Sequence, residues 1–155
     1  MKKLHALAIP ALLLALGSAP GPLNAGDGES LAIVVNMGVM VSKLTASELE
    51  AIFTTSKRTW PDGSNVSVFS YAPDNEVRRT FDKAVLRMSA DEVARFWIDQ
   101  RVRGGAPPPR QVPEPSLAIR LVAKLPGSIA YIPQDLVSPN VKVVARVING
   151  RVVEP

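Results

Sequence analysis

Short apolar runs divide the chain into predicted strands. Residues 31–35 (LAIVV) and 128–132 (SIAYI) are almost entirely apolar, which is typical of strands that are buried on both faces of a sheet. Residues 66–70 (VSVFS) alternate in the way that a half-buried strand does. Residues 141–144 (VKVV) predict a terminal strand, and the Asn-Gly pair at 149–150 predicts a hairpin turn after it.

Four segments between these strands have apolar residues at helical spacing. Two of them begin with a capping box, in which a hydroxyl residue and a glutamate three positions later bond each other's backbone N–H: Thr45 with Glu48, and Ser89 with Glu92. Another helix is expected to begin at residues 74–75, where either side chain can act as a cap. The predicted buried positions of the four helices are Leu49, Ile52 and Phe53; Val77, Phe81, Ala84 and Val85; Val93, Phe96 and Trp97; and Ala118, Leu121, Val122 and Leu125.

The elements follow one another in the order β-α-β-α-α-α-β, with further strands at the end. This order is typical of a small α/β domain whose central mixed sheet is flanked by helices. Pro61-Asp62-Gly63 has the chemistry of a tight turn, and Trp60 before it is expected to pack this corner against the preceding helix. Residues 103–115 are rich in glycine and proline and are expected to form a connector without regular structure.

The first 25 residues have the pattern of a cleavable leader. Two lysines are followed by an apolar run over residues 6–16 and then by small and turn-forming residues ending at Ala25. The apolar run is too short to span a membrane, which takes roughly 20 residues. We therefore predict a signal peptide over residues 1–25, a single domain over residues 26–155, export from the cytoplasm and no stable membrane insertion after cleavage. A buried N-terminal helix is the alternative.

Missing residue types exclude several kinds of enzyme. The chain has no cysteine, and its only histidine, His5, lies in the predicted leader. The exported protein would therefore lack the usual zinc ligands, and Ser-His-Asp and Cys-His catalytic sites are excluded as well. A hydrolase that uses only carboxylates remains an alternative, although no pair of acids stands in a distinctive setting. We predict a protein that is not an enzyme and that uses no metal and no cofactor.

The charge balance after cleavage does not indicate a nucleic-acid partner. Loss of Lys2 and Lys3 leaves 16 basic and 14 acidic residues, a net charge of +2. An exported protein rarely meets nucleic acid, so its arginines are expected on a solvated face, with a small anion as the better-matched partner for some of them.

Candidate binding residues lie where the strand over 66–70 leads into the next helix. Ligands of open α/β sheets bind beyond the carboxyl ends of strands, and a helix N-terminus offers free backbone N–H groups to an anion. An arginine one turn into the helix can add a bidentate guanidinium. The predicted ligand-binding residues are therefore Ser70, Tyr71, Asn75 and Arg78.

Two acids at the same place support a different interpretation. Asp74 and Glu76 stabilise a helix N-terminus but compete with an incoming anion. The alternative to a ligand site is therefore a well-capped helix start. If Arg78 binds an anion, Arg78→Ala is expected to abolish binding with little loss of stability, whereas a loss above about 2 kcal/mol would identify Arg78 as the partner of a buried acid.

Four stretches together resemble the periplasmic phosphate-binding proteins of ABC transporters. The stretches, in chain order, are LAIVVN, LTASELEAIFTTSKRTWPDGSNVSVFSY, RRTFDKAVL and PGSIAYIP. The resemblance implies one lobe of a periplasmic-binding-protein (type II) fold, a periplasmic location for the exported chain and a role in transport or sensing. It further implies phosphate or a similar small oxyanion as ligand, and an ABC permease or another periplasmic protein as partner. It also implies that the Trp-Pro-Asp-Gly corner is a structural junction.

The chain departs from the family pattern in two respects. The family has Gly-Ser-Gly-Thr before its Arg-x-x-Phe helix, whereas this chain has Asp74-Asn75-Glu76-Val77, although Arg78 coincides with the family's arginine. The resemblance also covers one lobe of a two-lobed protein, so a homodimer is one way to complete a cleft. Two functions follow as alternatives: an oxyanion receptor, and a ligand-free periplasmic interaction or accessory module that keeps the fold.

Overall fold

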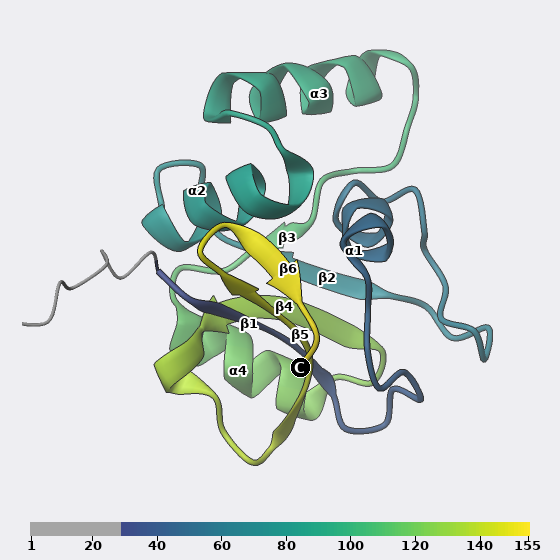
Figure 1. The fold of residues 1–155 in the computed structure, drawn as a ribbon. Helices are drawn as coiled ribbons and strands as arrows, with labels where there is room; N and C mark the ends of the chain where they lie inside the picture. The colour runs from purple at the N-terminus through teal and green to yellow at the C-terminus, as the bar shows by residue number, and fades with distance from the viewer. Residues whose placement is uncertain (1–28) are drawn as a thin grey trace, which may run out of the picture.

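The computed structural model describes residues 29–155 (Figure 1), and the predicted leader, residues 1–25, lies outside them. The described chain is a mixed sheet flanked by helices, as the pattern of elements predicted. Its elements are β1 (Leu31–Asn36), α1 (Ala46–Phe53), β2 (Ser67–Ser70), α2 (Glu76–Phe81), the π-helical η1 (Asp82–Leu86), α3 (Ala90–Val102), β3 (Arg110–Gln111), α4 (Pro115–Lys124), β4 (Ser128–Pro133), the 3-10 helix η2 (Gln134–Leu136), β5 (Val141–Ile148) and β6 (Arg151–Val153).

The sheet has six strands in the order β3-β2-β4-β1-β5-β6. β1 pairs antiparallel with both β4 and β5, while β2 pairs parallel with β4 and β3. α4 lies on one side of this sheet, and α1, α2 and α3 lie on the other (Figure 1). All of residues 31–35 are 0% exposed, so the prediction of a strand buried on both faces is confirmed. The hairpin is confirmed too, because Asn149 and Gly150 both have positive φ angles between β5 and β6.

Both predicted capping boxes are present. The Thr45 hydroxyl accepts a hydrogen bond from the backbone N–H of Glu48, whose carboxylate accepts one from the Thr45 N–H, and Ser89 and Glu92 repeat the arrangement. Local sequence therefore fixed where α1 and α3 begin. Each box satisfies two backbone N–H groups at the helix start that would otherwise have no partner within the helix.

The predicted buried stripe of α3 is only partly correct. Val93 is 3% exposed, but Phe96 and Trp97 are only half-buried. Ile98 and Val102, which were not part of the predicted stripe, are 61% and 81% exposed. α3 lies outside α2 and η1, away from the sheet (Figure 1). Only its inner side therefore meets the core, and the apolar spacing alone overestimated how much of the helix is covered.

The connector over residues 103–115 contains a short strand that the sequence did not predict. Arg110 and Gln111 pair with Phe69 and Ser70 of β2, and the Val112 N–H donates to the Ser70 carbonyl at 2.8 Å. An edge strand tolerates neighbouring prolines because one of its sides needs no backbone partner. This pairing draws the proline-rich connector across the end of β2.

The corner before β2 is a tight turn, as predicted. Gly63 has a φ of 84°, and its N–H donates to the Trp60 carbonyl at 2.9 Å. The Trp60 ring is 3% exposed, and its indole N–H donates to the Gly127 carbonyl at 2.9 Å. The corner is therefore hydrogen-bonded to the turn before β4, and the Trp60 ring belongs to the same hydrophobic core as the buried residues of α1.

Candidate functional site

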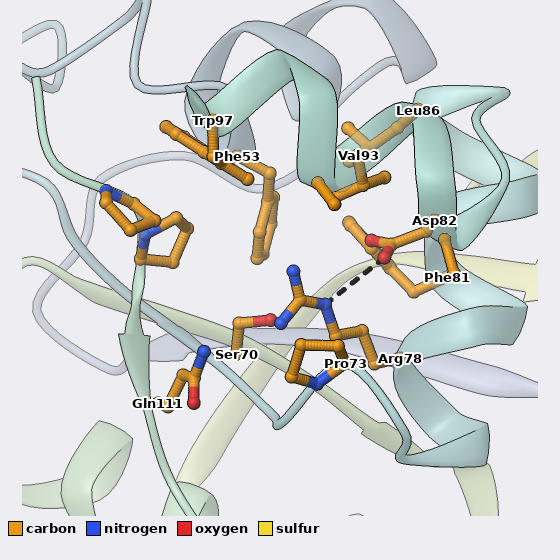
Figure 2. A pocket seen from close by; sticks show the side chains of 14 residues that line it. Phe53, Ser70, Pro73, Arg78, Phe81, Asp82, Leu86, Val93, Trp97 and Gln111 are labelled. Carbon is orange, nitrogen blue, oxygen red and sulfur yellow. Dashed lines mark hydrogen bonds and ion pairs between the residues drawn. The ribbon is translucent and has the colours of Figure 1, made fainter. Parts of the chain in front are cut away.

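A pocket of about 190 Å³ lies between α2, η1, α3 and the connector that carries β3 (Figure 2). Ten of its fourteen lining residues are apolar, including the aromatic residues Phe53, Phe81 and Trp97. The four polar residues are Ser70, Arg78, Asp82 and Gln111. The pocket therefore combines a largely apolar wall with a small group of hydrogen-bonding side chains.

Arg78 is the charged centre of this pocket and is held by two internal partners. Its side chain is 10% exposed, its Nε donates to Asp82 Oδ2 at 3.2 Å, and its Nη1 donates to the Tyr71 backbone carbonyl at 2.7 Å. Among the described residues, no hydrogen-bond partner is found for Nη2, and the guanidinium extends into the pocket (Figure 2). Arg78 is thus fixed in one direction and keeps donor capacity toward the open space.

Asp82 is the acid that the sequence interpretation missed. It is 7% exposed, and burial raises the pKa of its carboxyl above the ordinary value, because the opposing influence of the Arg78 charge is smaller. The i,i+4 spacing between Arg78 and Asp82 was visible in the sequence as a helical ion pair. The pairing changes the expectation for Arg78→Ala, because removing one member of a buried pair leaves the other uncompensated.

Ser70 and Tyr71, at the end of β2, take different positions. Ser70 lines the pocket, and its hydroxyl lies 2.7 Å from the Tyr131 hydroxyl. The Tyr71 side chain is 1% exposed and donates to the Tyr131 carbonyl at 2.8 Å, so that its ring belongs to the core. Burial raises the pKa of the Tyr71 hydroxyl well above its ordinary value. Tyr71 therefore supports the pocket through its carbonyl, which holds Arg78.

Asn75 caps α2 as predicted. Its side-chain oxygen accepts from the Arg78 backbone N–H at 3.3 Å, and its side chain is not among those that line the pocket. Nearby, Glu76 pairs with the Arg79 guanidinium on the exposed side of the helix. The structure therefore brings Ser70 and Arg78 together in the pocket and places the side chains of Tyr71 and Asn75 around it.

Gln111 and the prolines of the connector could not be assigned to this pocket from the sequence. Pro108, Pro109 and Gln111 reach it because β3 pairs with the last residues of β2. No local pattern marks such a long-range pairing. Trp97, a predicted core position, is half-buried, packs against the core and also lines the pocket.

A second hollow, of about 630 Å³, lies along β2 and the same connector. Its lining includes Lys57, Arg58 and Arg110, and none of the residues that line it is acidic. Lys57 has Glu48 at 3.9 Å, and the Arg110 guanidinium lies 6.0 Å from the centre of the Phe69 ring. This basic hollow is a second place where an anion could bind, so an experiment on the first pocket needs a control here.

Within residues 29–155, no group of three or more His, Cys, Asp or Glu side chains is arranged to hold a metal ion. None of the helices in this part of the chain has the length and apolar character required to cross a membrane.

Comparison with known proteins identifies the fold. No protein-family profile matches the chain, and no curated protein matches its sequence. An ABC-type phosphate transport receptor from Vibrio cholerae matches in structure with a TM-score of 0.61 and 21% identity, over 77% of this chain and 47% of the receptor. A phosphate ABC transporter substrate-binding protein from Clostridium perfringens, solved with bound phosphate, matches with a TM-score of 0.61 and 18% identity, over 77% of this chain and 46% of that protein.

A third structure supports the same assignment. PstS from Borrelia burgdorferi matches with a TM-score of 0.59 and 14% identity, over 74% of this chain and 46% of that protein. The chain thus spans about half the length of these binding proteins. The resemblance found in the sequence motifs is confirmed at the level of the fold, which is that of part of a substrate-binding protein.

Proposed function

We propose that this chain is an exported binding-protein domain that holds phosphate or a similar small oxyanion in the Arg78 pocket. Proteins of this fold include receptors for phosphate transport, one of them solved with bound phosphate. The protein binds its ligand and does not transform it. In this proposal Arg78 and Ser70 contact the anion, while Tyr71 and Asn75 keep Arg78 and its helix in place.

The fixed direction of the Arg78 guanidinium is the observation that carries the proposal. Two of its nitrogens are already bonded, to Asp82 and to the Tyr71 carbonyl, so little side-chain freedom remains to be lost when a ligand binds. The guanidinium extends toward the open centre of the pocket (Figure 2). Nη2 can donate a charge-assisted hydrogen bond to an oxyanion, and such bonds are stronger than hydrogen bonds between neutral groups.

The proposed setting is the periplasm. The leader over residues 1–25 would direct export, and the domain over residues 26–155 would deliver its ligand to an ABC permease or report it to another periplasmic protein. Because the chain spans about half the length of the matching receptors, a second copy is the proposed source of the other side of a cleft. A homodimer that forms only with ligand would support this arrangement.

A ligand-free accessory module is the second candidate, and a specific observation favours it. Asp82 already neutralises Arg78, so an incoming anion gains less from the guanidinium than it would from an unpaired one. Asp74 and Glu76 add negative charge beside the same helix start. Under this alternative the fold is retained for a surface that contacts a protein partner.

Calorimetric titration of the exported chain with phosphate and then sulfate, at low and at physiological salt, separates the two candidates. The receptor proposal predicts micromolar, competitive binding that Arg78→Lys weakens at least tenfold, because lysine keeps the charge opposite Asp82 but lacks the planar fork. Arg110→Ala, in the basic hollow, should leave that binding unchanged. Absence of heat and of thermal stabilisation at millimolar concentrations of inorganic and organic anions alike would support the accessory module.

A further inference from the structure

The apolar wall opposite Arg78 indicates that the ligand has an apolar part in addition to its anionic head group. We propose that the ligand is a small organic oxyanion, with a ring-sized apolar body and a carboxylate, phosphonate or sulfonate head, and that a bare inorganic anion is the poorer ligand. This inference rests on the proposed function, since it places the anionic head at Arg78.

The arrangement of side chains in the pocket has two distinct ends. Arg78, Ser70 and Asp82 lie together at one end, and Phe53 and Trp97 lie across the space from the guanidinium (Figure 2). Leu86, Val93, Pro108 and Pro109 are among the other apolar residues of the lining. A hydrated inorganic anion would bring only polar atoms against this wall, and polar atoms gain nothing from apolar contact. A ring joined to the anionic head would cover it.

The size of the pocket sets a limit on that body. An apolar cavity of about 150 Å³ holds a benzene molecule, and this pocket measures about 190 Å³. One ring or a compact branched chain, together with its head group, therefore fits the space. Pockets for larger drug-sized ligands start at about 300 Å³, so a body of two fused rings would be too large.

The neutralised arginine gives an organic anion a further advantage. Asp82 lies 3.2 Å from Arg78 Nε and offsets much of the charge that would attract a bare anion. Electrostatic attraction alone is therefore weak, and the burial of apolar surface has to supply the remaining affinity. The Gln111 amide, which lines the same pocket, adds a polar group that can bond the head without charge.

Matched ligands test the contribution of the ring. The exported chain is titrated calorimetrically with phosphate, methylphosphonate, phenylphosphonate, acetate and benzoate. We expect each ring-bearing ligand to bind at least tenfold more tightly than the ring-free ligand with the same head. Benzyl alcohol, which keeps the ring and lacks the charge, should bind at least tenfold more weakly than benzoate.

Two substitutions on α3 locate the ring. Ala94 lines the pocket from an exposed helix position, so Ala94→Trp should fill the apolar end of the pocket while the protein still folds. The variant should bind phenylphosphonate at least tenfold more weakly, while its affinity for methylphosphonate should change less than threefold. Ile98→Trp, on the same helix and outside the pocket lining, is the control and should change neither ligand.

The possible outcomes separate this inference from the proposed function. If phosphate and methylphosphonate bind as tightly as phenylphosphonate, the organic ligand class is overturned while the oxyanion receptor stands. If benzyl alcohol binds as tightly as benzoate, the anionic head is overturned. If none of these anions binds, the receptor proposal itself fails, and this inference fails with it. Binding of the ring-bearing anions alone supports the inference.

Discussion

The indole N–H of Trp60 donates to the backbone carbonyl of Gly127 across 2.9 Å, and joins the corner before β2 to the turn before β4. The Ser67 N–H donates to the same carbonyl at 3.0 Å. One oxygen therefore aligns the starts of two parallel strands. At the other end of β2, Ser70 reaches the pocket, so this alignment also sets where the pocket residues lie.

Gly127→Ala should be one of the most damaging small substitutions in the chain. Gly127 has a φ of 71°, and a Cβ built on it would lie 2.3 Å from the Asn65 carbonyl oxygen, which belongs to the backbone and cannot rotate away. We expect a loss of about 3 kcal/mol in the free energy of unfolding, since strain in the left-handed region and a steric clash add together.

Gly150→Ala is the matched control for this substitution. Gly150 has a φ of 72°, and no atom lies within 4 Å of the Cβ that would be added. The left-handed strain alone should cost about 1 kcal/mol. Urea unfolding of both variants measures the difference, and equal losses would show that the Asn65 carbonyl moves aside at little cost.

Arg78→Ala should destabilise the protein by about 3 kcal/mol, because it leaves the buried Asp82 without its cationic partner. Asp82→Ala should likewise be costly, since it leaves Arg78 buried and unpaired. The double variant should lose less than the sum of the two single losses, as expected for residues in direct contact. Urea unfolding of the four proteins measures the coupling, and strictly additive losses would contradict the pairing.

Asp82 should also make stability depend on pH. Burial raises the pKa of its carboxyl in the folded state. The unfolded chain releases this proton at the ordinary aspartate pKa of about 3.9, whereas the folded protein keeps it to a higher pH. The resulting stabilisation is complete below the unfolded pKa and is lost as the pH rises through the folded pKa, with a slope of at most about 1.4 kcal/mol per pH unit.

Asp82→Asn removes this titration and keeps a hydrogen-bond acceptor for Arg78. The difference in free energy of unfolding between the original protein and this variant should therefore shift in favour of the variant as the pH rises from 4 upward. Titrations at Glu48 and Glu92 occur in both proteins and cancel in the difference. A difference that stays constant with pH would mean that Asp82 ionises normally in the folded state.

Asn75 tests the distinction between a helix cap and a ligand contact. Asn75→Ala should cost about 1 kcal/mol, because the Arg78 N–H loses the side-chain oxygen that it bonds. Asn75→Ser keeps a capping oxygen and should stay within about 0.5 kcal/mol of the original stability. The side chain does not line the pocket, so ligand affinity should change less than threefold in Asn75→Ser. A folded Asn75→Ser protein that no longer binds its ligand would assign the amide to the site.

Elements whose signals are local were predicted well. These elements are the capping boxes at Thr45 and Ser89, the cap at Asn75 and the Asn-Gly hairpin. In each of them the interacting residues lie a few positions apart in the chain, so the sequence alone shows which groups will bond. The buried strand over residues 31–35 was equally clear, because a strand whose two faces are both covered is apolar on both of them.

Positions that depend on distant residues were not predicted. β3 forms because Arg110 and Gln111 pair with the end of β2, about 40 residues earlier in the chain. The proline-rich sequence around them contains no local signal for that pairing. The exposure of Val102 likewise follows from where α3 lies relative to the sheet (Figure 1). In both cases the deciding contact belongs to the tertiary structure.

The sequence by itself determined the fold class, the order of the elements, their caps and the position of Arg78 near a strand end, because periodicity, turn chemistry and capping act over short distances. Only the tertiary structure decided that Arg78 pairs with Asp82, that Tyr71 lies in the core and that prolines and Trp97 close an apolar pocket. Burial and side-chain pairing are set by packing between elements, and packing creates environments that no single stretch of sequence contains.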